Sequence, residues 1–135
     1  MMASLICAFS VGAFLQFLVS YCRSLVLSTR QVQVSDQVFE VAHLKSHAVA
    51  ANDFERFLPL ARLCGSYKQD RMRLRVVGAY YAALNVISRL GAMVPSIATW
   101  TEHERQHCSY FAAVALDRRI AYSRELCLQQ ASNAL

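Results

Sequence analysis

The sequence predicts an all-α protein in which a single N-terminal transmembrane helix precedes a small helical hairpin or bundle domain. Three observations lead to this prediction. The chain opens on a long stretch without a charged side chain or a histidine, and its later apolar residues recur at helical spacing behind cap-like residues. No glycine or proline follows Pro95. We expect two parts, a transmembrane anchor helix at residues 1–29 and a helical domain at residues 30–135.

The anchor prediction depends on the stretch Met1–Cys22. At ~1.5 Å per residue, a helix of this length spans roughly 33 Å and so crosses a hydrocarbon core of ~30 Å. Because backbone polar groups must be paired inside lipid, a lone segment can cross only as a helix. We therefore expect a single-pass anchor. The polar side chains of the stretch are all uncharged, and they are Ser4, Ser10, Gln16 and Ser20.

Three other interpretations of this stretch are less well supported. A cleaved secretory signal has a cationic start and a shorter apolar core, whereas no lysine or arginine precedes this long run. A lipoprotein Cys22 would follow a small residue, whereas Tyr21 is bulky. The third is a buried core helix of a soluble protein, and against it stands the lack of any polar stripe over five or six turns.

The flanking charges predict the orientation. No lysine or arginine precedes the stretch, whereas Arg23 and Arg30 follow it closely and Lys45 lies further on. Because such residues stay on the cytoplasmic side, we expect the N-terminus outside and the domain in the cytoplasm. Tyr21 falls where an aromatic residue meets the membrane interface. We expect Arg23 to extend to the lipid headgroups and the helix to continue to about Thr29.

The composition limits the partners. The formal net charge is +5 and arises mostly from arginine. On a membrane-anchored domain this excess favours contact with anionic lipid headgroups. No basic motif with groove-fitting or aromatic partners indicates nucleic-acid binding. The arginine- and alanine-rich usage is typical of a GC-rich, bacterial genome.

Cysteine usage predicts a reduced, intracellular domain. The number of cysteines is odd, none forms a C-x-x-C pair or a haem-attachment motif, and one lies well inside the apolar stretch. We expect no disulfide framework and thiols that act as small apolar side chains. The five are Cys7, Cys22, Cys64, Cys108 and Cys127.

The first part of the domain predicts a short extended segment and two helices. Valine and glutamine alternate just after the anchor, which indicates extended backbone. Ser35 or Asp36 would then cap a helix that reaches Ala48. Asn52 opens the next helix, because Glu55 follows it at the spacing of a capping box.

The next segments predict an interrupted helix and a central one. We expect Pro59 to kink the helix or break it near Leu58, and Gly65 to end it. A third helix opens at Asp70, and its run to Ile87 is apolar nearly all round, so we expect it to be the central buried helix. A second membrane span is the alternative, although the uncharged run is only about a dozen residues long.

The end of the chain predicts one long helix. Thr99 and Glu102 give a box-like start, and the helix would run to about Ser132, roughly 50 Å at ~1.5 Å per residue. Its apolar residues cover more than one face, so several neighbours must pack on it. These residues are Trp100, Tyr110, Phe111, Val114, Leu116, Ile120, Tyr122 and Leu126.

A literal H-E-x-x-H motif is the first chemical signal. His103 and His107 would share a helix face and could bind zinc, with Glu104 as the general base of a metalloprotease. Glu125 is the candidate third ligand, but on one unbroken helix it would lie roughly 27 Å from His107. The alternative interpretation is a polar first turn, in which Glu102 and Glu104 are favoured by the helix dipole.

A repeated E-x-x-H is the second chemical signal. Di-iron carboxylate bundles use two such pairs and a further glutamate from each of two other helices. Glu40 with His43 and Glu104 with His107 supply the pairs, and Glu55 one further glutamate, but a second is missing within one chain. We therefore predict no catalytic residue, no cofactor, and no cofactor-binding or metal-binding residue.

These observations favour a non-catalytic accessory or assembly subunit of a larger membrane protein complex. The span would pack on other helices through small residues such as Ala8, Gly12 and Ser20, and the domain would cover partner subunits. No small-molecule substrate is indicated. The alternative is a membrane-anchored metal-dependent enzyme of the H-E-x-x-H zinc or E-x-x-H di-iron type. A third interpretation is a self-associating membrane-surface scaffold, guided by Arg71, Arg73, Arg75, Arg118 and Arg119.

Overall fold

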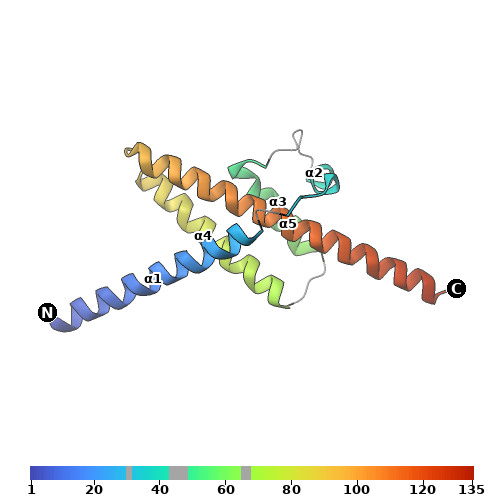
Figure 1. Cartoon of the computed structure of the whole chain (residues 1–135), viewed down its shortest axis with the longest axis horizontal. Helices are drawn as coiled ribbons and strands as arrows, with labels where there is room; N and C mark the ends of the chain where they lie inside the picture. The colour runs from blue at the N-terminus through green and yellow to red at the C-terminus, as the bar shows by residue number, and fades with distance from the viewer. Residues whose placement is uncertain (30–31, 43–48, 65–67) are drawn as a thin grey trace.

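Figure 1 shows the computed structural model, which describes residues 1–29, 32–42, 49–64 and 68–135. The prediction of an all-α chain is confirmed, since every regular element among these residues is helical. A long N-terminal helix and a helical hairpin cross near the middle of the molecule. The elements are α1 (Met2–Ser28), α2 (Asp36–Val41), the 3₁₀ turn η1 (Ala51–Asp53), α3 (Phe54–Leu63), α4 (Lys68–Leu90) and α5 (Pro95–Asn133).

Helix α1 has the predicted extent of the anchor. It ends at Ser28, with Thr29 as its C-cap. Within the described part of the chain it is the one helix long and apolar enough to span a membrane, and none of its most apolar part is buried in the protein. Figure 1 shows it projecting from the body. Near its C-terminal end, Cys22 and Val26 are buried where α1 meets α4 and α5.

Helix α5 is the central helix of the domain. It contacts α1, α2, η1, α3 and α4, so the prediction that several neighbours pack on it is confirmed. It begins at Pro95, four residues before the predicted start at Thr99, because proline suits the first turn, where its missing N–H is not needed. Its buried side chains fall between Thr101 and Arg119, and the run Phe111–Leu116 is buried without interruption.

Helix α4 is not the central helix, which corrects the prediction for the run that ends at Ile87. One face of α4 is buried against α5, while Ala79, Ala82 and Ala83 on the other side are exposed. These alanines, with the exposed Val86 and Ile87 further on, make the run apolar all round. The alanines bury little area and can face outward at little cost. The buried side chains of α4 are Leu74, Val77, Tyr80, Tyr81 and Leu84.

Helix α3 passes through Pro59 without a break, so of the two predicted effects of this proline, the break near Leu58 is wrong and the kink stays a prediction. Phe57 and Ala61 lie on either side of the proline along the helix, and both are fully buried in the core, where α3 packs on α5. Pro59 itself faces outward. Packing of both turns on α5 therefore outweighs the lost backbone hydrogen bond.

The start of this helix also differs from the prediction. Asn52 does not cap it, because η1 precedes α3 and the Asp53 carboxylate accepts the Ala50 N–H at 2.8 Å. Ser35 stands at the N-cap position of α2 with extended backbone angles, and the extended segment predicted before it stays a prediction. The Ser35 hydroxyl makes no cap bond and donates instead to Asp117 on α5. The predictions for Arg30, His43, Lys45, Ala48 and Gly65 fall outside the described residues.

A tight turn joins α4 to α5 and forms the hairpin. The Gly91 N–H donates to the Ile87 carbonyl at 2.7 Å, and the Val94 N–H donates to the Gly91 carbonyl at 2.9 Å. A Cβ on Gly91 would lie 2.5 Å from Cγ2 of Ile97. Glycine therefore favours the close return of α5 to the end of α4, because any larger residue would force the Ile97 side chain to shift.

Candidate functional site

The structure places the H-E-x-x-H histidines together on α5. The rings of His103 and His107 meet edge to face with centroids 4.3 Å apart. The predicted shared face is therefore present. His103 is exposed and His107 is half-buried, so the pair lies at the surface of the helix.

Glu104 points away from this pair and into the core. It is 1% exposed, the Tyr80 hydroxyl donates to its Oε2 at 3.2 Å, and Nε of Arg23 lies 3.3 Å from its Oε1. The sequence predicts Arg23 reaching toward headgroups, whereas the structure pairs it with this buried carboxylate. We call the contact of Arg23, Tyr80 and Glu104 the Glu104 junction. It joins α1, α4 and α5 at one carboxylate.

Burial and charge keep the neighbours of Glu104 protonated. Burial, together with the negative charge of Glu104, raises the pKa of the Cys108 thiol to about 12. Burial first, and then the charge and hydrogen bond of Glu104, raise the pKa of the Tyr80 phenol well above its usual range. Cys108 is therefore a poor nucleophile at neutral pH, and Tyr80 remains a hydrogen-bond donor.

Within the described ranges, the other predicted metal ligands do not gather around the histidines. Glu125 lies on the same unbroken helix α5, as expected, while Glu40 and Glu55 are exposed on α2 and α3. In the described part of the chain, no three or more His, Cys, Asp or Glu side chains lie close enough to hold a metal ion. The motif is therefore divided between a surface pair of histidines and a buried structural glutamate.

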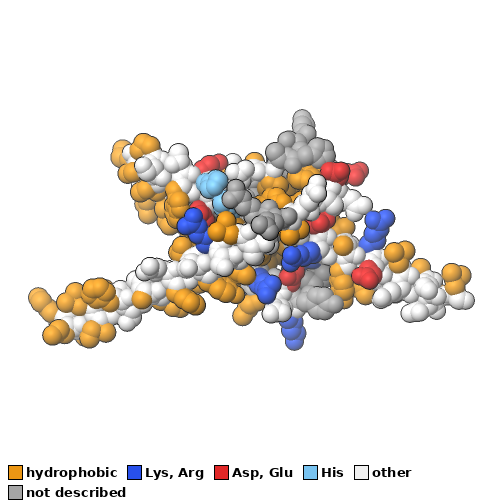
Figure 2. Space-filling model, viewed as in Figure 1, with side chains coloured by type: hydrophobic (Ala, Val, Ile, Leu, Met, Phe, Trp, Pro, Cys, Tyr) orange, Lys and Arg blue, Asp and Glu red, His pale blue; other side chains and the backbone are white. Residues whose placement is uncertain are grey.

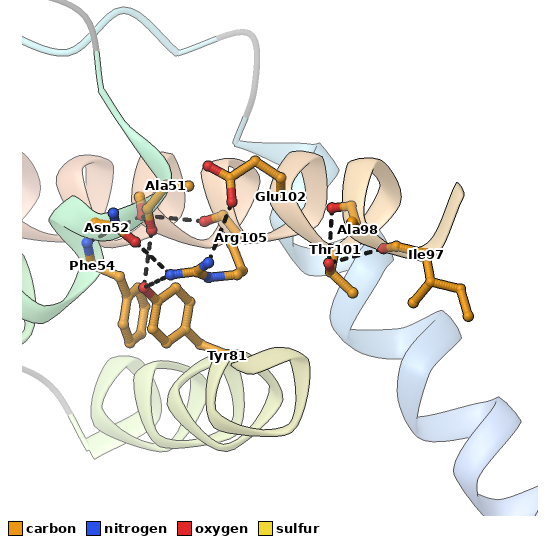
Figure 3. Close-up of polar contacts among 10 residues, drawn as sticks. Ala51, Asn52, Phe54, Tyr81, Ile97, Ala98, Thr101, Glu102 and Arg105 are labelled. Carbon is orange, nitrogen blue, oxygen red and sulfur yellow. Dashed lines mark hydrogen bonds and ion pairs between the residues drawn. The ribbon is translucent and has the colours of Figure 1, made fainter. Parts of the chain in front are cut away.

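A second polar cluster fixes η1 to the hairpin. The Arg105 guanidinium donates to Asn52 and, at 3.3 Å, to the Tyr81 hydroxyl, and it also lies over the Tyr81 ring (Figure 3). The Ser109 hydroxyl donates to the Ala51 carbonyl at 2.9 Å and accepts the Phe54 N–H at 3.1 Å. Ser109 thereby pairs the Phe54 N–H, which the start of α3 leaves without a partner inside the helix, and links it to a backbone carbonyl of η1. Arg105, which lies inside the H-E-x-x-H motif, therefore has a structural role.

The structure divides the predicted scaffold arginines into two groups. Arg73 and Arg118 line a small recess beside Thr29, at the C-terminal end of α1. The other three line a larger pocket between α3, α4 and α5, where they are joined by an arginine of α3 that sequence reasoning did not single out. The arginines of this pocket are Arg62, Arg71, Arg75 and Arg119.

The turn of the hairpin carries exposed apolar side chains. We call this surface the hairpin end. It extends from the last turns of α4 to the first turns of α5, and Arg89 is its one charged residue. Figure 2 shows hydrophobic side chains gathered there and along α1, both on the left of the view. The large apolar residues of the hairpin end are Val86, Ile87, Leu90, Met93, Val94, Ile97 and Trp100.

One of these features, the inward position of Glu104, could have been found from the sequence. Glu104 stands three residues after Thr101 and four before Cys108, which places it in line with two apolar or small side chains on the inward face. The pairing of Glu104 with Arg23 has no local signal, because the two are far apart in the sequence. Comparison of the chain with family models, with curated proteins and with solved structures finds no significant match.

Proposed function

We propose that the chain is a non-catalytic accessory or assembly subunit of a larger membrane protein complex. Helix α1 anchors it as a single span, with the N-terminus outside and the helical domain on the cytoplasmic side. One observation carries the proposal. The most apolar helix of the chain is left uncovered by the chain itself, while the apolar residues of the domain form an ordinary core.

The energetics of exposure support an apolar environment for α1. Removing one large apolar side chain from water is worth about 1.5–3 kcal/mol. Phe9, Phe14 and Phe17 are all exposed along this helix, as are several aliphatic side chains. An apolar surface of this extent on a water-soluble chain is unusual and marks a membrane or protein contact. Lipid around α1 removes the free-energy cost of exposing these apolar side chains to water.

The small residues of α1 favour contact with a partner's helix. Ala8 and Gly12 stand four apart, the spacing that lets two membrane helices approach closely. Beyond its neighbours and the backbone of its own helix, no atom of the described residues lies within 4 Å of a Cβ built on Gly12, so this face is open. The hairpin end lies on the same side of the molecule as α1 in Figure 2. We assign the open face of α1 to a membrane-embedded helix of a partner subunit, and the hairpin end to an apolar surface of a partner on the cytoplasmic side.

Basic residues around the end of α1 support the proposed orientation. Arg23 lies in the helix, and Arg73 and Arg118 line the recess beside Thr29. Arginines next to a span favour the cytoplasmic side and attract anionic headgroups there. The proposal therefore includes contact of this end of α1 with acidic lipids.

Photo-crosslinking from defined positions tests the subunit assignment. A photoreactive residue at Phe9, three residues from Gly12 on α1, or at Met93 on the hairpin end should give a discrete adduct with another membrane protein. Leu128, which is exposed at the far end of α5, is the matched control and should give none. A clean monomer after mild detergent extraction, with adducts to lipid alone, would contradict the proposal.

Cysteine labelling tests the orientation. A variant that retains only Cys127, exposed near the end of α5, should resist a membrane-impermeant maleimide in intact cells and react after permeabilisation. Labelling in intact cells would place the domain outside and reverse the proposed topology.

The metal-dependent enzyme remains the alternative because of one contact, the edge-to-face approach of His103 and His107. Metal analysis of the purified protein distinguishes the two functions. The subunit proposal predicts less than stoichiometric zinc or iron. Stoichiometric metal that is lost in His107→Ala would favour the enzyme instead.

A further inference from the structure

The pocket between α3, α4 and α5 is built around guanidinium groups. Its volume is about 710 Å³, within the range of ligand-binding pockets. Arg62 comes from α3, Arg71 and Arg75 from α4, and Arg119 from α5. We call it the arginine pocket. Three separate helices bring their cations to one cavity, although like charges repel one another.

Arg119 is the most buried of the four cations. It is 4% exposed, and its Nη1 donates to the Ala61 carbonyl. Its Nη2 is buried without a hydrogen-bond partner among the described residues. The Asp70 carboxylate lies 3.9 Å from Nε, beyond hydrogen-bond distance. A buried guanidinium with so distant a counter-charge leaves a positive potential in the cavity, which an anion would offset.

The charges favour a phosphate over a single carboxylate. None of the ten described residues that line the pocket is acidic. With Asp70 counted as the neighbour of Arg119, an excess of three positive charges remains. A phosphate monoester carries up to two negative charges and three acceptor oxygens, and the planar guanidinium matches such oxygens in pairs. One carboxylate would leave most of the positive charge uncompensated.

The remaining lining indicates that the ligand is more than a bare ion. Leu58, Leu63 and Leu74 supply apolar surface, and Gly78 and Ala79 leave room beside them. Ligand pockets typically combine such surface with a few polar groups that fix orientation. A carbon skeleton attached to the phosphate would fill this apolar part.

We propose that the arginine pocket binds the phosphate group of a small phosphorylated molecule, either a soluble phosphate compound or an anionic lipid headgroup. The phosphate is contacted by Arg62, Arg71 and Arg75, and the buried Arg119 adds positive potential to the cavity. No lining residue belongs to α1, so the inference does not depend on the role proposed for that helix.

The test uses the full chain in zwitterionic detergent micelles with inorganic pyrophosphate as the probe, followed by isothermal titration calorimetry. We expect saturable binding that weakens about tenfold in Arg62→Gln and again in Arg75→Gln, since each removes a charged hydrogen bond. Arg56→Gln on α3 and Arg89→Gln on α4 are matched controls, because both arginines are exposed and lie outside the pocket lining. Their dissociation constants should stay within about twofold of the wild-type value.

A second titration distinguishes the sources of the phosphate. Short-chain phosphatidic acid that displaces pyrophosphate assigns a lipid headgroup, and pyrophosphate binding that it does not displace assigns a soluble compound. Either result supports the phosphate site. The proposal is overturned if wild-type protein binds neither probe, or if Arg56→Gln and Arg89→Gln weaken binding as much as the pocket variants do.

Discussion

The two longest helices reverse the usual relation between hydropathy and burial. Helix α1 has a single charged residue, Arg23, and yet most of it is uncovered. Helix α5 carries charged residues along its length and yet supplies more of the buried side chains than any other described helix. The difference shows that burial follows from neighbours: α5 has helices on several sides, whereas only the end of α1 meets the domain.

This comparison separates two kinds of apolar surface. Around Phe111–Leu116, apolar residues face one another and stabilise the domain by leaving water. Along the most apolar part of α1 the same residue types have no partner among the described residues, so they contribute little to the stability of the isolated domain. Lipid or a partner's helix is the environment in which they become favourable. Equivalent substitutions in α1 and in the core around Phe111–Leu116 should therefore have effects that differ in sign or size.

The largest contrast is expected in thiol reactivity. Cys108 is buried beside Glu104, and its raised pKa of about 12, against an ordinary 9.0, lowers the thiolate fraction at pH 8 about a thousandfold. Cys127, exposed on the same helix, should react with iodoacetamide far faster. Mass spectrometry of the time course measures both sites. Equal rates in the folded protein would contradict the packing of α5.

Removing a core leucine should destabilise the domain strongly. Leu116→Ala on α5, where the side chain is 0% exposed, should lower the free energy of unfolding by about 2–5 kcal/mol. Leu15→Ala on α1, where the side chain is 53% exposed, is the matched control and should change it by less than about 0.5 kcal/mol. Urea unfolding in mild detergent, followed by Trp100 fluorescence, measures both. A loss in Leu15→Ala as large as that in Leu116→Ala would mean that α1 is part of the domain core.

The Glu104 junction should matter more than a surface ion pair. Glu104→Gln should lower the free energy of unfolding by about 2 kcal/mol, because it weakens charge-assisted bonds to Tyr80 and Arg23 in a buried site. Glu102→Gln removes only an exposed pair with Arg105 and should cost less than about 0.5 kcal/mol. The same unfolding measurement compares them. Equal effects would show that α1 is not held to the hairpin at this carboxylate.

The smallest contrast concerns two glycines. In Gly91→Ala the new methyl would crowd Ile97 and the Ile87 carbonyl, and we expect a loss of about 1 kcal/mol. Gly12→Ala meets nothing in the chain and should leave domain stability unchanged. In the assembled complex, Gly12→Ala should have the larger effect of the two, because close approach of two membrane helices needs the small residue. Co-purification of crosslinked partners with each variant measures this second effect.

Local sequence patterns predicted where the helices lie better than they predicted how the helices pack. The uncharged opening stretch identified α1, and the absence of glycine or proline identified α5. Alanines made α4 look buried, because hydropathy counts a small exposed side chain like a large inward one. Pro59 looked like a break, because sequence does not show that Phe57 and Ala61 hold both turns on α5.

The sites depended on contacts between distant segments. Helical spacing correctly placed His103 beside His107, but the core partner of Glu104 is Arg23 on another helix. Likewise, five arginines from two stretches of the sequence were predicted to act as one basic set, while the structure sorts them by the cavity that each lines. Arg119 is buried because its turn of α5 faces Ala61 of α3. Such pairings follow from helix crossings, which a single sequence does not specify.

Alkaline carbonate extraction of membranes that contain the full chain tests the central claim, that α1 is surrounded by an apolar phase that the chain does not provide. The account predicts that the wild-type chain stays in the membrane pellet. A variant with Phe14→Lys and Phe17→Lys, which leaves the domain core untouched, should be released. Release of the intact wild-type chain into the supernatant would contradict the account.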